Sequence, residues 1–341
     1  MWQVGGIGLR LGACLCLLAA ATVLADDQFP PRQFPPQQMT PPAESVGATP
    51  ARRDCGCRPV CNCGNSGVGL FDNVSLFLGL EGSKQPQDYG VNAHFGGRFA
   101  ADMGMPLIED IGLGLQVGTS INYTDNAVQF FEKFGEATGR FQSFTTVGLF
   151  QRNDAGLVWG GAVDYLHQTY YDTADLFQFR GRVGWQFTEQ TEVGFLTSLS
   201  NDKDRNSVAG VPITLAPLNQ GSVYFKQRWE SQAETMLWVG IAESHGERNL
   251  AFEALLLPPA NARQRPAGER LVFGAQIHVP LNDYVALFGQ GNFILPADTG
   301  TVDSYLGFVV YPSGGAKQSQ RSRFAPLMPV ANSTNFSVNL R

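Results

Sequence analysis

The chain has 341 residues, of which 43% are hydrophobic and only 16% are charged, with 39 glycines and a formal net charge of -6. This length suffices for one large domain or two ordinary ones, and the acidic balance argues against a nucleic-acid-binding protein. After the N-terminal region there is no run of about 18 apolar residues, which excludes a membrane-spanning helix. Low charge with many glycines still suits a β barrel, whose lipid-facing side chains are spread along the chain.

The N-terminal region has the features of an export signal followed by a spacer. Arg10 precedes an apolar run from Leu11 to Leu24, and Ala25 ends a small-residue cleavage site, so we expect a signal peptide over residues 1–25. A retained anchor is the alternative. Residues 26–54 contain QFPP twice and predict an extended, proline-rich linker that cannot build a core.

Residues 55–68 hold a dense cluster of cysteines, namely Cys55, Cys57, Cys61 and Cys63. Exported thiols meet an oxidising compartment, so these residues are disulfide candidates, within the segment or in crosslinks to neighbouring envelope proteins. Tetrahedral zinc sites usually space their paired cysteines by two to four residues. The single-residue spacing here therefore favours disulfides over a metal.

From Val74 onward, apolar residues alternate with glycine and polar residues, which is the pattern of β-strands with one apolar face. The stretch 269–294 is the fullest example, with a turn at 280–283 between two strands. Counting the less regular segments at 140–152, 157–170, 192–199, 233–244 and 304–311, we expect about twelve strands, an even number as in bacterial outer-membrane barrels. The fold predicted for residues 70–312 is therefore an all-β, antiparallel, up-and-down transmembrane β barrel.

The connections between these strands alternate in length. Short turns are expected at 153–156, 188–190, 230–232 and 280–283, and long connections at about 123–139, 200–219 and 245–268. Outer-membrane barrels have short periplasmic turns and longer outer loops. The connection at 171–175 is the exception, because it is short where a long one is expected.

The second face of the strands carries Gly, Gln, Asn, His and Arg rather than the Lys and Glu of an ordinary wet surface. We interpret it as the inner face of the barrel. The candidate lumen-lining residues are Glu81, His94, Arg98, Asp164, Arg180, Arg182, Lys226, Arg228, Gln276 and His278. These side chains either fill the interior and satisfy one another or line a pore with an anion preference.

Residues 313–341 depart from the alternating pattern. The last clear strand ends near Tyr311, and about thirty residues follow it. This tail either returns as an extra strand, enters the lumen as a plug, or stays loose.

The sequence contains little that suggests catalysis. Ser244 and His245 are adjacent, which does not assemble a hydrolytic triad, and His278 is predicted to face inward. Asp298 and Asp303 lie in a turn whose spacing does not match a calcium loop. We therefore predict a non-enzymatic protein with no catalytic residues, no metal and no cofactor.

Three stretches together resemble an uncharacterised family of exported, outer-membrane β-barrel-like proteins of planctomycete bacteria, a domain of unknown function. They are LNDYVALFGQGNFI, PADTGTVDSYLGFVVYP and the segment from EGSKQPQDYGVNAHFGGRF to INYTDNAVQ. The resemblance covers residues 70–340. It implies a barrel fold and an outer-membrane location, and it brings no activity with it.

Two functions from different classes remain open on the sequence. The first is a non-enzymatic outer-membrane barrel, either porin-like or structural, with the lipid bilayer as its main partner. The alternative is a soluble, secreted β-sandwich that binds or supports other proteins, and a barrel-embedded hydrolase is a third. A sandwich would pack its apolar faces against each other, whereas a barrel exposes them to lipid.

Overall fold

The computed structural model describes residues 73–88, 93–126, 139–208, 211–243, 269–295, 301–318 and 322–340. The predicted signal peptide, proline-rich linker and cysteine cluster lie outside the described residues and stay predictions. Ser244, His245 and Asp298 also lie outside the described residues. None of the helices among the described residues is long and apolar enough to cross a membrane.

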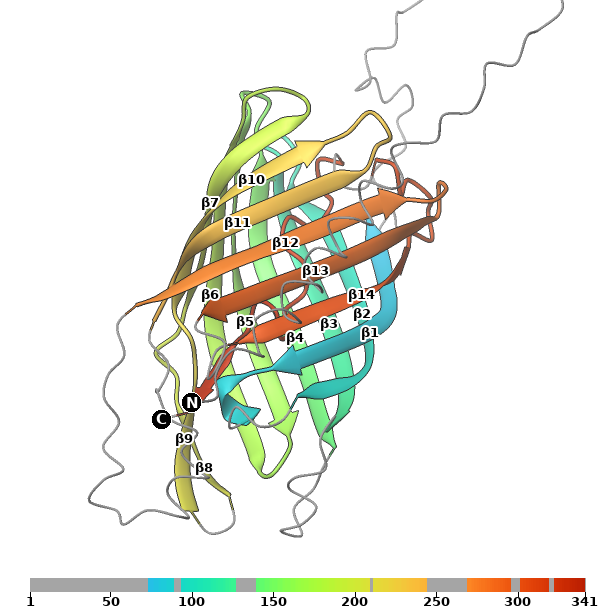
Figure 1. Cartoon of the computed structure of the whole chain (residues 1–341). Helices are drawn as coiled ribbons and strands as arrows, with labels where there is room; N and C mark the ends of the chain where they lie inside the picture. Colours follow the sequence, from blue (N-terminus) through green and yellow to red (C-terminus); the bar gives the residue numbers. More distant parts are fainter. Residues whose placement is uncertain are drawn as a thin grey trace, which may run out of the picture. The chain divides into compact units, whose positions relative to one another are not determined.

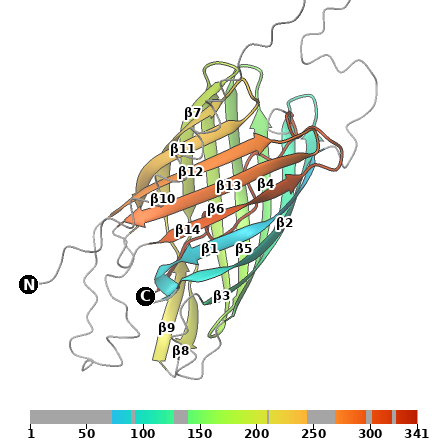
Figure 2. The same ribbon diagram turned by 45° about the vertical axis from the view of Figure 1, so that its right-hand side comes forward.

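Twelve strands form one closed antiparallel barrel (Figures 1 and 2). They are β1 (Val74–Lys84), β2 (His94–Ile108), β3 (Leu113–Asn126), β4 (Arg140–Arg152), β5 (Leu157–Thr169), β6 (Thr173–Gln186), β7 (Thr191–Leu199), β10 (Gln220–Arg228), β11 (Glu234–Ala242), β12 (Arg270–Pro280), β13 (Val285–Leu295) and β14 (Val302–Val310). The pairing of β1 with β14, from Leu76↔Val310 to Lys84↔Val302, closes the sheet. This confirms the predicted fold, and the sandwich alternative is wrong because the twelve strands close on one another and leave the outward apolar residues exposed rather than packed against another sheet.

The outer surface of the barrel is apolar. Along β6, Phe177, Phe179, Val183 and Trp185 are each about half exposed, while the alternate residues Arg180 and Arg182 are buried. The same alternation runs through the other long strands. Strands with apolar residues outward and polar residues at the alternate, inward positions are the arrangement that spans a lipid bilayer.

This exterior gives a direct prediction. Phe179 lies at the middle of β6, so Phe179→Arg places a charge at mid-membrane depth and is expected to lower the free energy of unfolding by about 2–4 kcal/mol. Phe187, just beyond the end of β6, is the matched control. Phe187→Arg is expected to cost about 0–1 kcal/mol in the same urea titration in lipid vesicles. Equal costs at the two positions would argue against a membrane around the strands.

The two rims of the barrel differ as the sequence indicated. Short turns connect β2–β3, β4–β5, β6–β7, β10–β11 and β12–β13 at one rim, called here the short-turn rim. The strand ends that the longer connections join lie at the other rim, and so does the short β5–β6 turn. The 200–219 connection, which the sequence indicated only as long, contains a hairpin of β8 (Asp204–Val208) and β9 (Val211–Pro217). Two prolines in β9 interrupt the alternation by which the other strands were found.

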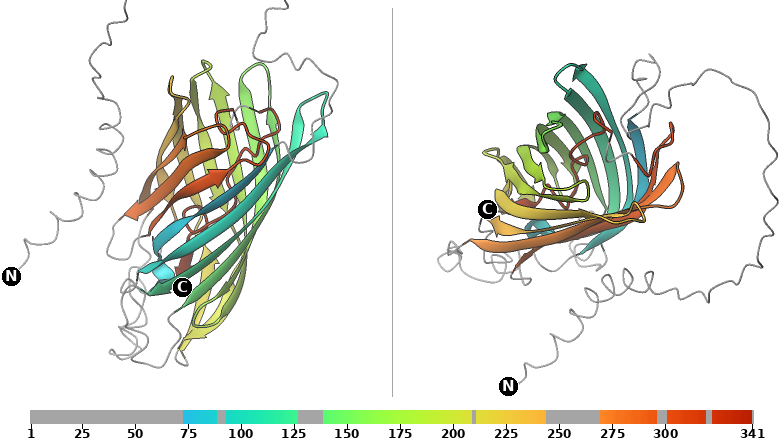
Figure 3. Two further views of the ribbon diagram at one scale, coloured as in Figure 1. Left: turned by 90° about the vertical axis from the view of Figure 1, so that its right-hand side faces the viewer. Right: turned by 90° about the horizontal axis from the view of Figure 1, so that it is seen from above.

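The C-terminal residues return into the barrel after β14. At the short-turn rim, the backbone N–H of Ala316 donates to the carbonyl of Asp283 at 2.8 Å. Residues 322–340, called here the interior segment, then run inside the ring of strands (Figure 3) and end in β15 (Val338–Leu340), which pairs with β9. The hydrophobic core of the protein is therefore inside the barrel. Its largest cluster joins Phe336 and Val338 of the segment to Phe144, Leu166 and Leu176 of the wall.

Candidate functional site

All the predicted lumen-lining residues lie on the inner face of the strands. Glu81, His94, Arg98, Asp164, Arg180, Arg182, Arg228 and His278 are buried, and Lys226 and Gln276 are half-buried. The structure sorts them into two groups. One group contacts the interior segment or lies close to it, and Lys226, Arg228 and His278 pair within the wall. Arg98 lies over the ring of Tyr305, with its Cζ 4.2 Å from the ring centroid.

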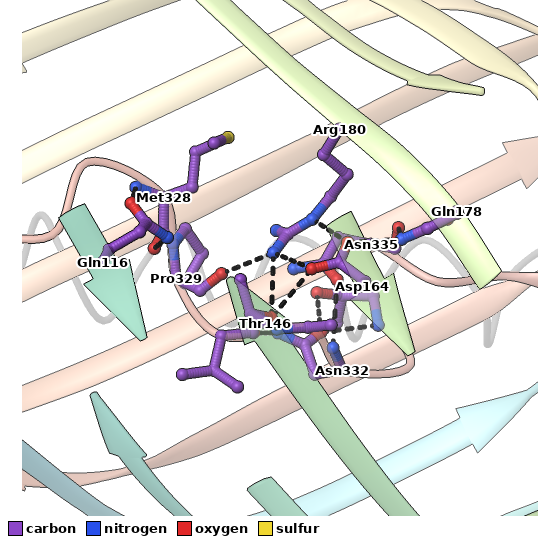
Figure 4. A network of polar contacts seen from close by, with 12 residues as sticks. Gln116, Thr146, Asp164, Gln178, Arg180, Met328, Pro329, Asn332 and Asn335 are labelled. Carbon is purple, nitrogen blue, oxygen red and sulfur yellow. Dashed lines mark hydrogen bonds and ion pairs between the residues drawn. The ribbon is translucent and has the colours of Figure 1, made fainter. Parts of the chain in front are cut away.

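The central contact to the interior segment is made by a buried ion pair between β5 and β6 (Figure 4). Asp164 accepts from Arg180 Nε at 2.5 Å and from Arg180 Nη2 at 2.9 Å. It also accepts from Thr146 Oγ1 and Gln178 Nε2, at 2.8 and 3.0 Å. Nη2 of Arg180 donates in addition to the carbonyl oxygen of Pro329, at 2.9 Å. The carboxylate thus fixes the guanidinium that holds the segment, a charge-assisted contact in a place that water does not reach.

Side chains of β3 both donate hydrogen bonds to the backbone of the interior segment and accept hydrogen bonds from it. Gln116 Oε1 accepts from the N–H groups of Leu327 and Met328, at 3.1 and 3.2 Å, and its Nε2 donates to the Met328 carbonyl at 3.1 Å. Ser120 Oγ donates to the Ala331 carbonyl at 2.9 Å. These bonds satisfy backbone groups that would otherwise be buried without partners, since the segment here belongs to no ladder.

Two arginines donate hydrogen bonds to carbonyl oxygens of the segment near the short-turn rim. Arg152 Nη1 donates to the Ala325 carbonyl at 2.5 Å, and Arg182 Nη1 donates to the Leu327 carbonyl at 3.0 Å. Arg182 also forms an ion pair with Glu192 of β7 at 2.8 Å. The carbonyl oxygens of the segment therefore meet positive charge where it enters the barrel.

Toward the other rim, the segment contacts a carboxylate of the wall instead of arginines. Glu81 Oε1 accepts from Ser333 Oγ at 2.5 Å, and Asn122 Nδ2 donates to Glu81 Oε2 at 2.7 Å. Gln85 Nε2 donates to the Ser333 carbonyl at 3.1 Å, and Gln85 Oε1 accepts from the Val338 N–H at 3.2 Å. The segment is thus bonded to the wall from one rim nearly to the other.

A second buried ion pair lies beside this end of the segment. Asp88, in the short 3-10 turn Pro86–Asp88, contacts Arg140 Nη1 at 3.3 Å and His94 Nε2 at 3.1 Å. Burial by itself would raise the pKa of the Asp88 carboxyl, but Arg140 and His94 outweigh it and hold that pKa below its usual value. The carboxylate therefore stays ionised and orders the connection between β1 and β2.

The wall formed by β10–β13 holds the second group. Glu234 pairs with Lys226 at 2.7 Å and also with Arg228. His278 Nε2 lies 2.9 Å from Tyr311 Oη, so its contact is with a phenol rather than with a serine nucleophile. No group of three or more His, Cys, Asp or Glu among the described residues could hold a metal ion.

Sequence reasoning missed several residues that contact or support the interior segment. Gln116 lies in a strand whose alternation is clear, so its inward direction could have been found. Arg140 and Arg152 lie in the less regular stretch 140–152, where the period alone still points them inward. Asp88 could not have been found, because it follows the strand in a connection with no period.

A scan against protein-family models matches residues 73–338 of the chain to the family of unknown function DUF6666. The chain belongs to the DUF6666 family. The match begins just before β1 and ends within β15, so it includes the interior segment as well as the barrel. This confirms the predicted membership in a family of unknown function. The planctomycete source and the export of that family stay predictions.

The search of solved structures compared this DUF6666 chain with several membrane barrels. The KdgM porin is 5% identical, with 70% of this chain and 98% of that chain covered and a TM-score of 0.37. The translocator domain of the autotransporter NalP from Neisseria meningitidis is 10% identical, with 70% and 87% covered and a TM-score of 0.40. Outer membrane phospholipase A from Escherichia coli is 8% identical, with 73% and 94% covered and a TM-score of 0.36. Values at this level say nothing about the activity of this chain. No curated protein sequence matches it.

Proposed function

We propose that this DUF6666 chain is a non-enzymatic outer-membrane β barrel whose resting state is closed by its own interior segment, and that it serves the cell envelope structurally rather than as an open porin. The single observation that supports this most is the bonding of residues 322–340 to the inner wall by Arg152, Arg180, Arg182, Gln116 and Glu81. A path for solutes along this wall would have to displace that segment.

The outer-membrane location rests on the apolar exterior and the even strand number. β1 begins at the short-turn rim, which faces the periplasm in barrels of this kind. The linker 26–54 and the cysteines of 55–68 would then lie in the periplasm after export by the signal at 1–25. Cys55, Cys57, Cys61 and Cys63 would be available there for disulfides with one another or with envelope proteins, a covalent tether for a structural barrel.

A porin-like role is the second candidate, and one observation favours it. Four arginines of β4 and β6 (Arg140, Arg152, Arg180, Arg182) face the interior against one aspartate of β5, Asp164. Positive inner walls favour the entry of anions. In the closed state these arginines bond to the segment or to wall carboxylates, so permeation requires the segment to leave.

The proposed membrane location and the proposed closed state each predict one result for the natural, full-length protein. It is expected in the membrane fraction, released only by detergent, and reconstituted into a planar bilayer it should give no steady current steps at moderate voltage. A soluble mature chain would rule out the membrane location. Steady steps from the untreated protein would rule out the closed resting state and favour the open porin.

A further inference from the structure

The inner wall contains glycines whose missing side chains leave room for the interior segment. A Cβ on Gly104 would lie 2.0 Å from the carbonyl oxygen of Phe324 and 3.0 Å from Pro326, so its three nearest neighbours all belong to the segment. A Cβ on Gly118 would lie 2.3 Å from a methyl carbon of Val330. Real Cβ atoms do not approach other atoms this closely, so the wall is hollowed at these two places along the path of the segment.

Two apolar side chains of the segment pack against apolar side chains of the same wall. Leu327 packs with Phe150 and Val158, and a Cβ on Gly160 would lie 3.0 Å from its Cδ2. Phe336 is fully buried and meets Phe144 edge to face at 5.9 Å between ring centroids. These two anchors fix the register of the segment.

Apart from these anchors, the wall bonds mainly to backbone atoms of the segment. Arg152, Arg180 and Arg182 donate to carbonyl oxygens, and Thr146 Oγ1 accepts from the Ala331 N–H at 2.9 Å. Backbone groups are the same in any polypeptide, so this part of the wall recognises a peptide backbone rather than particular side chains.

We propose that the inner wall of β2–β6 is a binding site for a polypeptide segment, occupied in the resting state by this chain's own residues 322–340 and able to bind the same segment supplied as a separate peptide. The proposal rests on the closed state argued above and explains how it is reversible. The segment joins no barrel strand, so it can leave without breaking the ladder that closes the wall. Its tether keeps it at an effective concentration on the order of millimolar, which favours the occupied state.

The test uses the full-length chain with Leu327→Asp and Phe336→Asp, which removes both anchors and leaves the wall unchanged. A fluorescent synthetic peptide with the sequence of residues 322–340 is titrated with this variant in detergent micelles, and its anisotropy is measured. We expect saturable binding to the variant, none to the natural protein at the same concentration, and none with a scrambled peptide.

Two further variants in this background locate the site. Arg152→Gln removes a donor to the segment's carbonyls and is expected to weaken peptide binding about tenfold. Arg228→Gln is the matched control, because its partner Glu234 belongs to the wall, and it should leave the affinity within about twofold of its parent. Equal losses would contradict the assignment of the site.

The proposal is overturned if the peptide fails to bind a variant whose far-UV circular dichroism still shows the barrel, or if it binds the natural protein equally well. If the double variant does not fold, Phe336→Ala replaces it, since this change introduces no charge, and the same two outcomes apply. Steady conductance of the natural protein would instead contradict the proposed closed state, which the conductance experiment tests separately from this binding measurement.

Discussion

Full-length protein carrying Leu327→Asp and Phe336→Asp is expected to give discrete current steps in a planar bilayer where the natural protein gives none. Each aspartate puts a carboxylate into a cluster of buried apolar side chains. Burying such a charge without a partner costs several kcal/mol, so the segment is expected to leave the wall rather than bury the charge there. The wall that remains exposes arginines, and the current through it is expected to favour anions.

The control adds the same two charges where nothing is buried. Pro312 and Gln318 are both exposed and precede the interior segment. The double variant Pro312→Asp and Gln318→Asp should therefore remain closed. Closure of both variants would show that the anchors do not hold the segment, and current from both would point to a general effect of added charge.

Asp164→Asn is expected to lower the free energy of unfolding by about 3–5 kcal/mol, the usual cost of removing one partner of a buried ion pair. The carboxylate of Asp164 accepts from three side chains and is fully buried, and the guanidinium of Arg180 would remain inside without its counter-charge. Chemical denaturation in lipid vesicles measures the change.

A control ion pair and a double variant test whether the loss of the buried Asp164–Arg180 pair causes this decrease in the free energy of unfolding. Asp283 and Lys317 form an ion pair that is mostly exposed, so Asp283→Asn should cost only about 0–1 kcal/mol. Combining Asp164→Asn with Arg180→Gln should cost less than the sum of the two single changes, with a coupling of about 0.5–3 kcal/mol. Additive costs would mean that the two side chains act independently.

The barrel itself was predictable because its signal is local. A strand with one lipid face repeats every second residue, so Phe177, Phe179 and Val183 are identified as outward by their spacing alone. The same spacing places Arg180 and Arg182 on the opposite, inward face. The hairpin of β8 and β9 was not predicted, because it is short and contains two prolines.

The interior segment was not predictable in the same way. Its partners lie far away along the chain: Gln116 and Met328 are separated by 212 residues, and Glu81 and Ser333 by 252. Residues 313–341 show no sustained period, because a chain that crosses a barrel interior is bonded through scattered side chains and not through a ladder. The sequence therefore left open whether this tail is a strand, a plug or a loose end.

The sequence by itself determined which half of each strand meets lipid and which half faces inward, since alternation along an extended backbone requires nothing beyond neighbouring residues. Only the tertiary structure decided what the inward half does. The pairing of β5 with β6 brings Asp164 to Arg180, and the folded barrel places Gly104 and Gly118 opposite the interior segment. Whether the interior is open or occupied depends on contacts between residues far apart in the chain, which a local pattern does not encode.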